Sequence, residues 1–234
     1  MQLLAFEAST QRLSVALWRE GELLERHALL PNSGSEVLLP WMHQLLAEAG
    51  IGLRQLDGIA FGAGPGGFTG LRLACSVTQG LAYGLELPVA PICTLAALAL
   101  DCGQPRVWAC LDARMNEVYA AAYTVEGDTV REAMAPVCLP PDAAAAAVPP
   151  APTFAAPWGA GDGFARYGDI LRAQRADLAG VSADLLPTAT AVARLAAPLL
   201  AAGGGVTAAD AQPLYVRNKV AFTTAERLAR GGSK

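Results

Sequence analysis

Histidine is nearly absent from this chain of 234 residues, and its scarcity excludes several kinds of catalytic site. Only His27 and His43 are present, and the patterns HxxH, HxxxH and HExxH do not occur, which excludes a zinc site built on histidine. Nucleophilic catalysis by a Ser–His–Asp or Cys–His group would need one of these two histidines, and the GxSxG pattern is missing as well. We therefore expect neither a metal site nor histidine-dependent hydrolysis.

Paired cysteines, charge and long apolar runs are also scarce. The five cysteines are widely spaced without a CxxC pair, which is typical of reduced thiols in a cytoplasmic protein. Charged residues make up 16% of the chain and the formal net charge is −4, which argues against a protein that binds nucleic acid by itself. The apolar stretch 87–100 contains two prolines and is shorter than the ~20 residues of a spanning helix, and no signal peptide is recognisable. We expect a cytoplasmic protein without a membrane segment.

The few charges are unevenly placed. Residues 217–234 contain five basic residues and one acidic residue, so the rest of the chain is correspondingly more acidic. Such a basic tail could contact RNA or an acidic partner, or it could simply be a solvated chain end, and the sequence leaves both interpretations open.

Small residues are abundant, with 48 alanines and 24 glycines. This composition indicates closely packed backbones, or a surface that stays partly apolar until a partner covers it. The glycines and prolines also divide the chain into short segments whose periodicity can be read.

The first half of the chain predicts the order β-β-β-α-β-α-β-α. Alternating and apolar runs predict strands, and apolar residues at helical spacing predict helices. Strands are expected at 2–6, 12–18, 22–30, 56–62 and 88–92, and helices at 37–49, 69–85 and 94–100. Strands that alternate with helices imply parallel, right-handed crossovers.

In the second half, three strands followed by helices repeat the start of this order, which hints at two similar lobes with a boundary near Gly103-Gln104. Strands are expected at 106–112, 117–125 and 129–138, and helices at 164–172 and 188–202. The Ala/Pro-rich stretch 140–157 is expected to be irregular or mobile.

A glycine-rich loop between a predicted strand and a predicted helix is the most distinctive motif. Five glycines stand in the nine residues 62–70, which means that a Cβ would clash there or that something approaches the backbone closely. It is not a P-loop, because Phe68-Thr69 stands where Lys-Ser/Thr is needed. A dinucleotide site and a tight strand-to-helix turn both remain open, with the turn favoured.

Two polar clusters accompany this loop. Glu7-Ala8-Ser9-Thr10 follows the first strand, where an acid and two hydroxyls could bind phosphate or a metal-bound water, or could merely form the turn. Asp112 and Arg114 stand between two strands, where they could orient a ligand or simply pair.

The helix after the glycine loop has a groove of small residues. Ser76, Gly80 and Gly84 recur every four residues, and a mid-helix glycine such as Gly80 costs about 1 kcal/mol relative to alanine. Close approach of another helix, within the chain or from a partner, would compensate for this. Since the helix 37–49 has an apolar face too wide for one sheet, we expect both helices to form an interface through Leu38, Trp41, Met42, Leu45, Leu73, Ser76, Val77, Gly80 and Gly84.

Five segments in order along the chain resemble the TsaB (YeaZ) family of the glycoprotease-like group. They are Glu7–Thr10 after a strand, Ser35–Pro40, Gly62–Arg72, Asp112–Tyr119 and Leu214–Asn218. The combination of GPGxFTGLR with DARMxEVY is highly specific for this family.

The resemblance implies an α/β fold with two ribonuclease H-like lobes of the actin-like ATPase (sugar kinase/Hsp70) superfamily, each a mixed sheet with helices. Residues 1–103 would form the N-terminal lobe, completed by part of 208–234, and residues 104–207 the C-terminal lobe. Glu7, Ser9, Thr10, Gly64, Gly66 and Gly67 would then be a vestigial nucleotide or phosphate loop. Glu7 replaces the family's usual Asp, and Gly34 its common His, which further weakens such a site.

The resemblance also implies a function in tRNA N6-threonylcarbamoyladenosine modification. The chain would be a non-catalytic subunit that scaffolds and activates TsaD, together with TsaE, through a helix bundle, and it would form a homodimer when alone. It would have no cofactor of its own, with ATP at the interface of the complex, and would meet tRNA only through the complex. The alternatives are a metalloprotease of the glycoprotease group and an active small-molecule kinase of the same fold.

Overall fold

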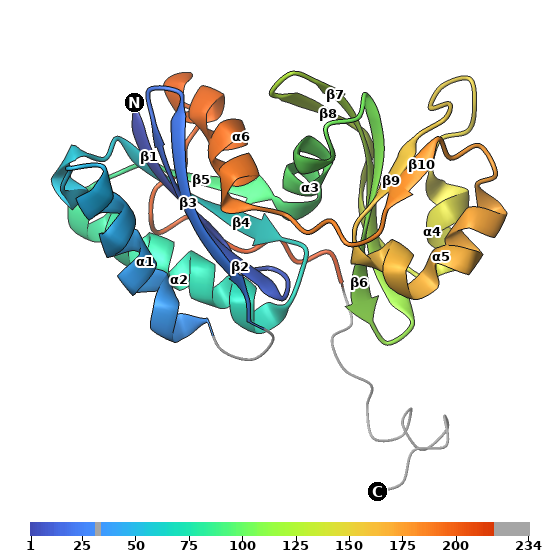
Figure 1. Ribbon diagram of the computed structural model, residues 1–234, viewed down its shortest axis with the longest axis horizontal. Helices are drawn as coiled ribbons and strands as arrows, with labels where there is room; N and C mark the ends of the chain where they lie inside the picture. The colour runs from blue at the N-terminus through green and yellow to red at the C-terminus, as the bar shows by residue number, and fades with distance from the viewer. Residues whose placement is uncertain (31–33, 218–234) are drawn as a thin grey trace, which may run out of the picture.

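The computed structural model describes residues 1–30 and 34–217, which form two five-stranded sheets with helices packed on them (Figure 1). The sequence Ser33-Gly34-Ser35-Glu36 fits a helix capping box, but Ser33 itself and nearly all of the basic tail lie outside the described residues. In the described part of the chain, no helix combines the length and apolar character that a membrane crossing requires.

The first sheet joins an antiparallel meander to two parallel strands, in the order β3-β2-β1-β4-β5. Glu20 and Gly21, both with positive φ, form the tight turn between β2 and β3, where a two-residue hairpin needs left-handed backbone. Its strands are β1 (Gln2–Glu7), β2 (Arg12–Arg19), β3 (Glu22–Leu29), β4 (Gly58–Gly64) and β5 (Val89–Cys93).

Helices cover both faces of this sheet (Figure 1). On one face α1 (Ser35–Glu48) and α2 (Phe68–Leu85) contribute to a core with Phe6, Val15 and Phe61, and a short 3₁₀ turn, η1 (Leu53–Gln55), precedes β4. On the other face lie α3 (Thr94–Cys102) and α6 (Ala189–Ala201).

Helix α6 packs on the first sheet although it follows the second sheet in the chain. Its alanines lie against Leu3 and Ala5 of β1, and Ala189 N–H donates to Ser14 Oγ of β2 (2.8 Å). Asp101 of α3 accepts from the N–H and the hydroxyl of Thr188 (2.9 and 3.0 Å), the residue that caps α6. Helix α6 lies within residues 104–207 but packs on the sheet of the first lobe, and Ala208 and Ala211 pack in the core of that lobe as well.

The second sheet has the same plan, in the order β10-β9-β6-β7-β8, with three antiparallel strands and two parallel ones. Helix α3 reaches it through Leu95, Leu98 and Ala99, so one helix contributes to the cores of both lobes. The two sheets share one strand order, and the predicted α/β class with two mixed sheets is confirmed. Its strands are β6 (Arg106–Arg114), β7 (Glu117–Glu126), β8 (Thr129–Leu139), β9 (Trp158–Ala160) and β10 (Gly180–Ser182).

The outer face of this sheet carries α4 (Pro141–Ala147) and α5 (Asp162–Gln174). The expectation that 140–157 is irregular is wrong for α4, whose Ala144 and Ala145 are buried. Proline at its first position suits a helix start, because that N–H has no helical partner in any case.

Arg175 fastens the rest of this stretch. Its guanidinium donates to the carbonyls of Val148 (3.2 Å), Pro149 (3.1 Å) and Phe154 (3.3 Å), and it pairs with Asp177 (2.8 Å). Buried carbonyl groups need hydrogen-bond partners, and here one buried arginine supplies several of them.

We expect Arg175→Met to lower the free energy of unfolding by at least about 2 kcal/mol, because three carbonyls lose a donor while the side-chain volume is nearly kept. Urea unfolding followed by circular dichroism measures this. Arg172→Met, at an exposed arginine in the last turn of α5 just before Arg175, is the control and should change stability by less than about 0.5 kcal/mol. Equal effects of the two variants would contradict the role given to Arg175.

Candidate functional site

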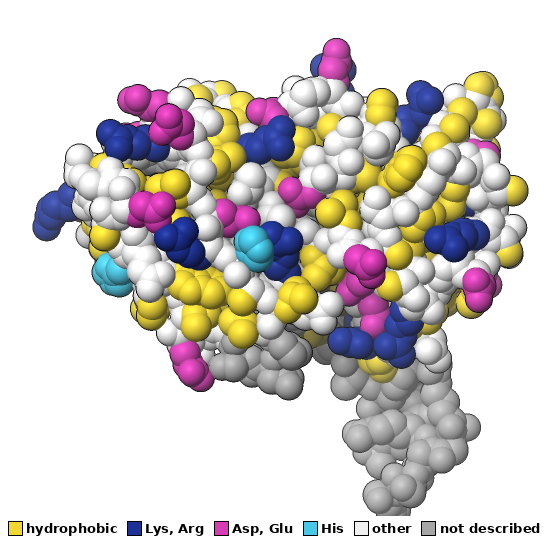
Figure 2. Space-filling view, viewed as in Figure 1, with side chains coloured by type: hydrophobic (Ala, Val, Ile, Leu, Met, Phe, Trp, Pro, Cys, Tyr) yellow, Lys and Arg dark blue, Asp and Glu magenta, His cyan; other side chains and the backbone are white. Residues whose placement is uncertain are grey.

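A cleft of about 1120 Å³ separates the two lobes. Its first wall consists of the turn after β1, the start of α1 and the glycine loop, and its second wall of the end of β6 and the first turns of α5. Acidic and basic side chains stand close together at the foot of the second lobe in Figure 2. The polar residues that line this second wall are Asp112, Arg114, Tyr119, Asp162, Arg166 and Arg217.

The glycine loop is packed against the backbone of the turn after β1. Gly67 N–H donates to the Ser9 carbonyl (2.7 Å), and Gly64 N–H donates to Thr94 Oγ1 (3.2 Å). A Cβ on Gly66 would lie 2.5 Å from the Ser9 oxygen, and one on Gly70 would lie 1.7 Å from the Ala8 oxygen. Of the two interpretations of the loop, the tight turn therefore explains these glycines through contacts within the chain.

Glu7 is enclosed by this packing. The carboxyl is fully buried, its Oε1 accepts the Ser9 N–H (2.6 Å), and its Oε2 has no partner. A Cβ on Gly62 would lie 1.8 Å from Oε2, so this glycine closes over the acid. Burial raises the pKa of the Glu7 carboxyl, because a charge without solvent is unfavourable. The protonated acid is the form that this enclosure favours.

Ser9 and Thr10, which were also expected in the phosphate loop, form part of the turn after β1. Ser9 is buried, and Thr10 Oγ1 accepts the Arg12 N–H (3.2 Å), which closes the turn into β2. The structure does bring Glu7, Ser9, Gly66 and Gly67 together, but as a packed junction. Among the described residues, no group of three or more His, Cys, Asp or Glu is placed to hold a metal ion.

Asp112 and Arg114, which were expected either to orient a ligand or to pair, are paired. Asp112 Oδ2 lies 3.1 Å from Arg114 Nη1 and 3.3 Å from Arg166 Nη1, and Oδ1 accepts the Arg114 N–H (2.8 Å). Asp162 accepts the N–H of Asp112 (2.9 Å), and burial raises the pKa of its own carboxyl. The acids of this wall are thus engaged with neighbours.

The expected groove on α2 is open. Ser76, Gly80 and Gly84 are exposed, and a Cβ placed on either glycine would meet nothing within 4 Å. Leu73 and Val77 are half-buried alongside, and Tyr83 is 80% exposed next to the groove. No described helix of this chain fills the groove, so neither glycine is packed against another element of the described chain.

Three of the interface residues expected on α1 are placed differently. Leu38, Met42 and Leu45 are fully buried against the lobe's own sheet, because the apolar face that suggested an interface is the one the core needs. Trp41 is only half-buried, and Leu39 and Leu29 are exposed. Figure 2 shows apolar side chains gathered over α1 at the lower left. The exposed apolar surface of α1 is therefore narrower than the predicted interface and lies closer to Leu39.

Sequence reasoning missed several exposed or bridging residues. Tyr83 carried no motif, and Leu29 lay in a strand that looked like an ordinary edge. Tyr215 was noticed only within a family motif, and Arg217 only there and in the basic tail. Their contacts with Arg72 and Glu117 are distant in sequence.

Comparison with known proteins places this architecture in one family. The family model for TsaD, tRNA N6-adenosine threonylcarbamoyltransferase, matches residues 32–213. The tRNA threonylcarbamoyladenosine biosynthesis protein TsaB of Escherichia coli is 32% identical over 228 residues, which is 95% of this chain and 97% of the relative. TsaB of Haemophilus influenzae is 44% identical over 123 residues, about half of each chain.

Solved structures agree. The crystal structure of an uncharacterized Pseudomonas aeruginosa protein with similarity to peptidase YeaZ has a TM-score of 0.86 and 41% identity. YeaZ from Pseudomonas aeruginosa has a TM-score of 0.83 and 39% identity. Both comparisons cover 92% of this chain and 99% of the other.

The raised pKa of Glu7 predicts how Glu7→Gln changes stability with pH. As pH rises above about 4.5, the unfolded acid ionises while the folded acid stays protonated, so the wild type loses up to about 1.4 kcal/mol per pH unit until the folded pKa is passed. The variant lacks this loss. In urea unfolding, the stability of the variant relative to the wild type should therefore increase as pH rises above about 4.5, until the raised pKa of folded Glu7 is passed.

The amide introduced by Glu7→Gln brings two donors into a buried site, which adds an offset that does not depend on pH. The diagnostic quantity is therefore the slope with pH, and Asp101, whose pKa is raised to about 7, cancels because both proteins contain it. A difference that stays constant across this pH range would show that Glu7 is ionised in the folded protein.

Two glycines of α2 should respond oppositely to alanine. Gly70→Ala should lower the free energy of unfolding by at least about 2 kcal/mol, because its Cβ collides with the Ala8 carbonyl. Gly80→Ala meets open space and should raise it by up to about 1 kcal/mol through helix propensity. Chemical unfolding of both variants is the measurement, and similar effects would contradict the assigned packing.

Proposed function

The chain belongs to the TsaB (YeaZ) family of tRNA threonylcarbamoyladenosine biosynthesis proteins, and from this premise we propose that it is a non-catalytic subunit that binds and activates TsaD. The observation that carries the proposal is the open groove of Ser76, Gly80 and Gly84 on α2. Small residues at this spacing let the backbone of a second helix come close, and no described helix of this chain lies in the groove.

The apolar surroundings of the groove support a protein partner. Tyr83 and Leu39 are large exposed side chains on the two helices that share this face of the sheet, with Leu29 at the end of a neighbouring strand. Exposed apolar side chains that gather on one face are typical of protein–protein contact sites. The same surface would serve a second copy of the chain when TsaD is absent, and the chain would then be a homodimer.

The environments of Glu7 and Asp112 support a role in which this chain does not itself catalyse a reaction. Glu7 is enclosed with a raised pKa, and Asp112 is held by two arginines. A kinase of this fold would need a charged carboxylate facing its nucleotide, and a metalloprotease would need a cluster of metal ligands. We therefore place the transfer reaction on TsaD, ATP at the interface of the complex with TsaE, and tRNA contact in the assembled complex.

We expect Gly80→Leu to weaken association with TsaD by at least about tenfold, or about 1.4 kcal/mol, because the leucine fills the groove. The variant should fold, since the site is open and leucine favours helix more than glycine does. Pull-down and size-exclusion titration with purified TsaD measure association, and thermal unfolding checks the fold.

The control is Gly168→Leu on α5 in the other lobe, a glycine just after a kink at Tyr167 with open space where its Cβ would lie; thermal unfolding checks that this variant folds too. The functional readout is threonylcarbamoyladenosine formation on tRNA by TsaD and TsaE, with the wild type, either variant or no added chain. Wild-type binding by folded Gly80→Leu would remove the groove from the interface. Full activity without the chain would overturn the proposed function itself.

A further inference from the structure

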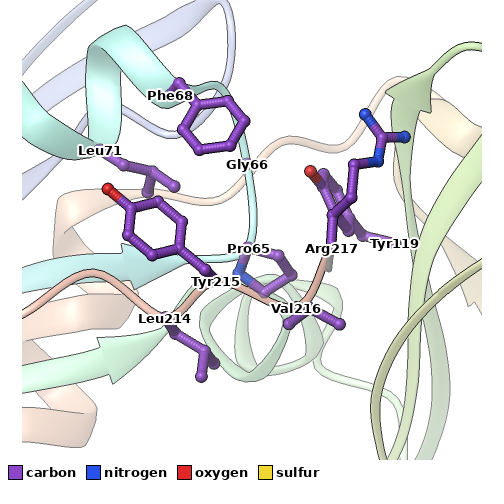
Figure 3. A pocket seen from close by; sticks show the side chains of 9 residues that line it. All are labelled: Pro65, Gly66, Phe68, Leu71, Tyr119, Leu214, Tyr215, Val216 and Arg217. Carbon is purple, nitrogen blue, oxygen red and sulfur yellow. The ribbon is translucent and has the colours of Figure 1, made fainter. Parts of the chain in front are cut away.

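The last described residues, 214–217, cross the cleft from the first lobe to the second (Figures 1 and 3). The segment leaves the first sheet at Leu214, whose N–H donates to the Ala63 carbonyl of β4 (2.7 Å). Gly64, with φ +118°, admits this approach, because a Cβ there would lie 2.8 Å from the Leu214 oxygen. The crossing is therefore built into the glycine loop.

Tyr215 anchors the segment on the first turn of α2. Its ring packs on Phe68 with centroids 5.4 Å apart, and its hydroxyl accepts the Nε–H of Arg72 (3.3 Å). The Arg72 guanidinium lies 5.4 Å from the centre of the Phe68 ring, so the three side chains form one stack. Figure 3 shows the Tyr215 and Phe68 rings together on the first-lobe side of a small cavity.

Arg217 anchors the segment on the second lobe. Its Nη2 donates to the Ala113 carbonyl (2.8 Å) and to Glu117 Oε2 (2.6 Å), and its guanidinium lies 5.8 Å from the centre of the Tyr119 ring. The side chain is only 10% exposed, and Val216 packs into the core of the same lobe. A buried, charge-assisted contact of this kind is stronger than an exposed ion pair.

The hairpin that Arg217 holds is strained. Arg114, Met115 and Asn116 have φ values of +60°, +55° and +60°, a left-handed conformation that residues other than glycine adopt rarely, and here it occurs three times in succession. Such backbone persists only where neighbouring contacts fix it. Arg217 also lies 3.4 Å from the Arg114 carbonyl and 3.8 Å from Met115 Sδ.

We infer that residues 214–217 form an interlobe clasp, which holds the cleft at its observed width and keeps the hairpin 114–116 in its strained conformation. Opening the cleft on this side requires loss of the stack at Tyr215 or of the contacts of Arg217. Among the described residues, the other ion pair between the lobes joins Arg194 and Asp128. These side chains are 34% and 49% exposed, so this pair holds the lobes weakly.

The test compares Arg217→Gln with Arg194→Gln, two arginines that each pair across the lobes. In hydrogen-exchange mass spectrometry of the full chain, Arg217→Gln should speed exchange of the amides of 113–119 by about tenfold or more. Arg194→Gln should leave them within about twofold of the wild type. Amides of β1 and β2 report whether the first lobe stays intact.

A second measurement follows the lobes directly. Labels introduced through non-natural amino acids at the exposed positions Arg54 and Asp169 avoid the five native cysteines and report the interlobe distance. Both Arg217→Gln and Tyr215→Ala should lengthen or broaden this distance. Tyr215 is 47% exposed, so its variant remains informative where Arg217→Gln does not fold. Wild-type distances and wild-type hairpin exchange in the folded variants would overturn the clasp.

Discussion

The structure depends on one close approach of backbone to backbone, where the turn after β1 meets the glycine loop after β4. Gly62, Gly66 and Gly70 have Glu7, Ser9 and Ala8 where their side chains would be. This contact fixes the first turn of α2 and, through Ala63, the path of the clasp. The absence of a Cβ at these glycines therefore fixes both where the groove on α2 lies and how the segment between the lobes runs.

Much of the first lobe could be predicted, because its segments are short and their periodicity is clear. The strands at Arg12–Arg19 and Glu22–Leu29 and the helix at Phe68–Leu85 begin and end within one or two residues of their expected limits. The sheet on which a helix packs could not be predicted in the same way. The alanine-rich sequence of α6 does not indicate which sheet it covers. In the structure its alanines pack on β1, and hydrogen bonds to Ser14 and Asp101 hold its first turn.

The candidate site was predictable where a motif forced a backbone shape and unpredictable where long side chains reach across the fold. The spacing of Ser76, Gly80 and Gly84 indicated a groove on α2, but it left open whether a helix of this chain fills it. Leu38, Met42 and Leu45 were misplaced because an apolar helix face looks the same whether a core or a partner covers it. Arg175 and Arg217 act through carbonyl groups that are far away in sequence, for which the sequence holds no local sign.

The groove on α2 has a direction as well as a width. Its residues continue a row that starts one turn earlier at exposed Arg72, and from Arg72 to Gly84 this row rises about 18 Å along the helix. Rows at a spacing of four residues are inclined to the helix axis by about 26°, so a helix lying in this row crosses α2 obliquely and cannot run parallel to it. A partner helix in this row would have to remain helical over about three turns, and one of its ends would meet the Arg72 guanidinium. The Arg72 side chain also donates to the Tyr215 hydroxyl, so one residue links the start of this row to the segment between the lobes.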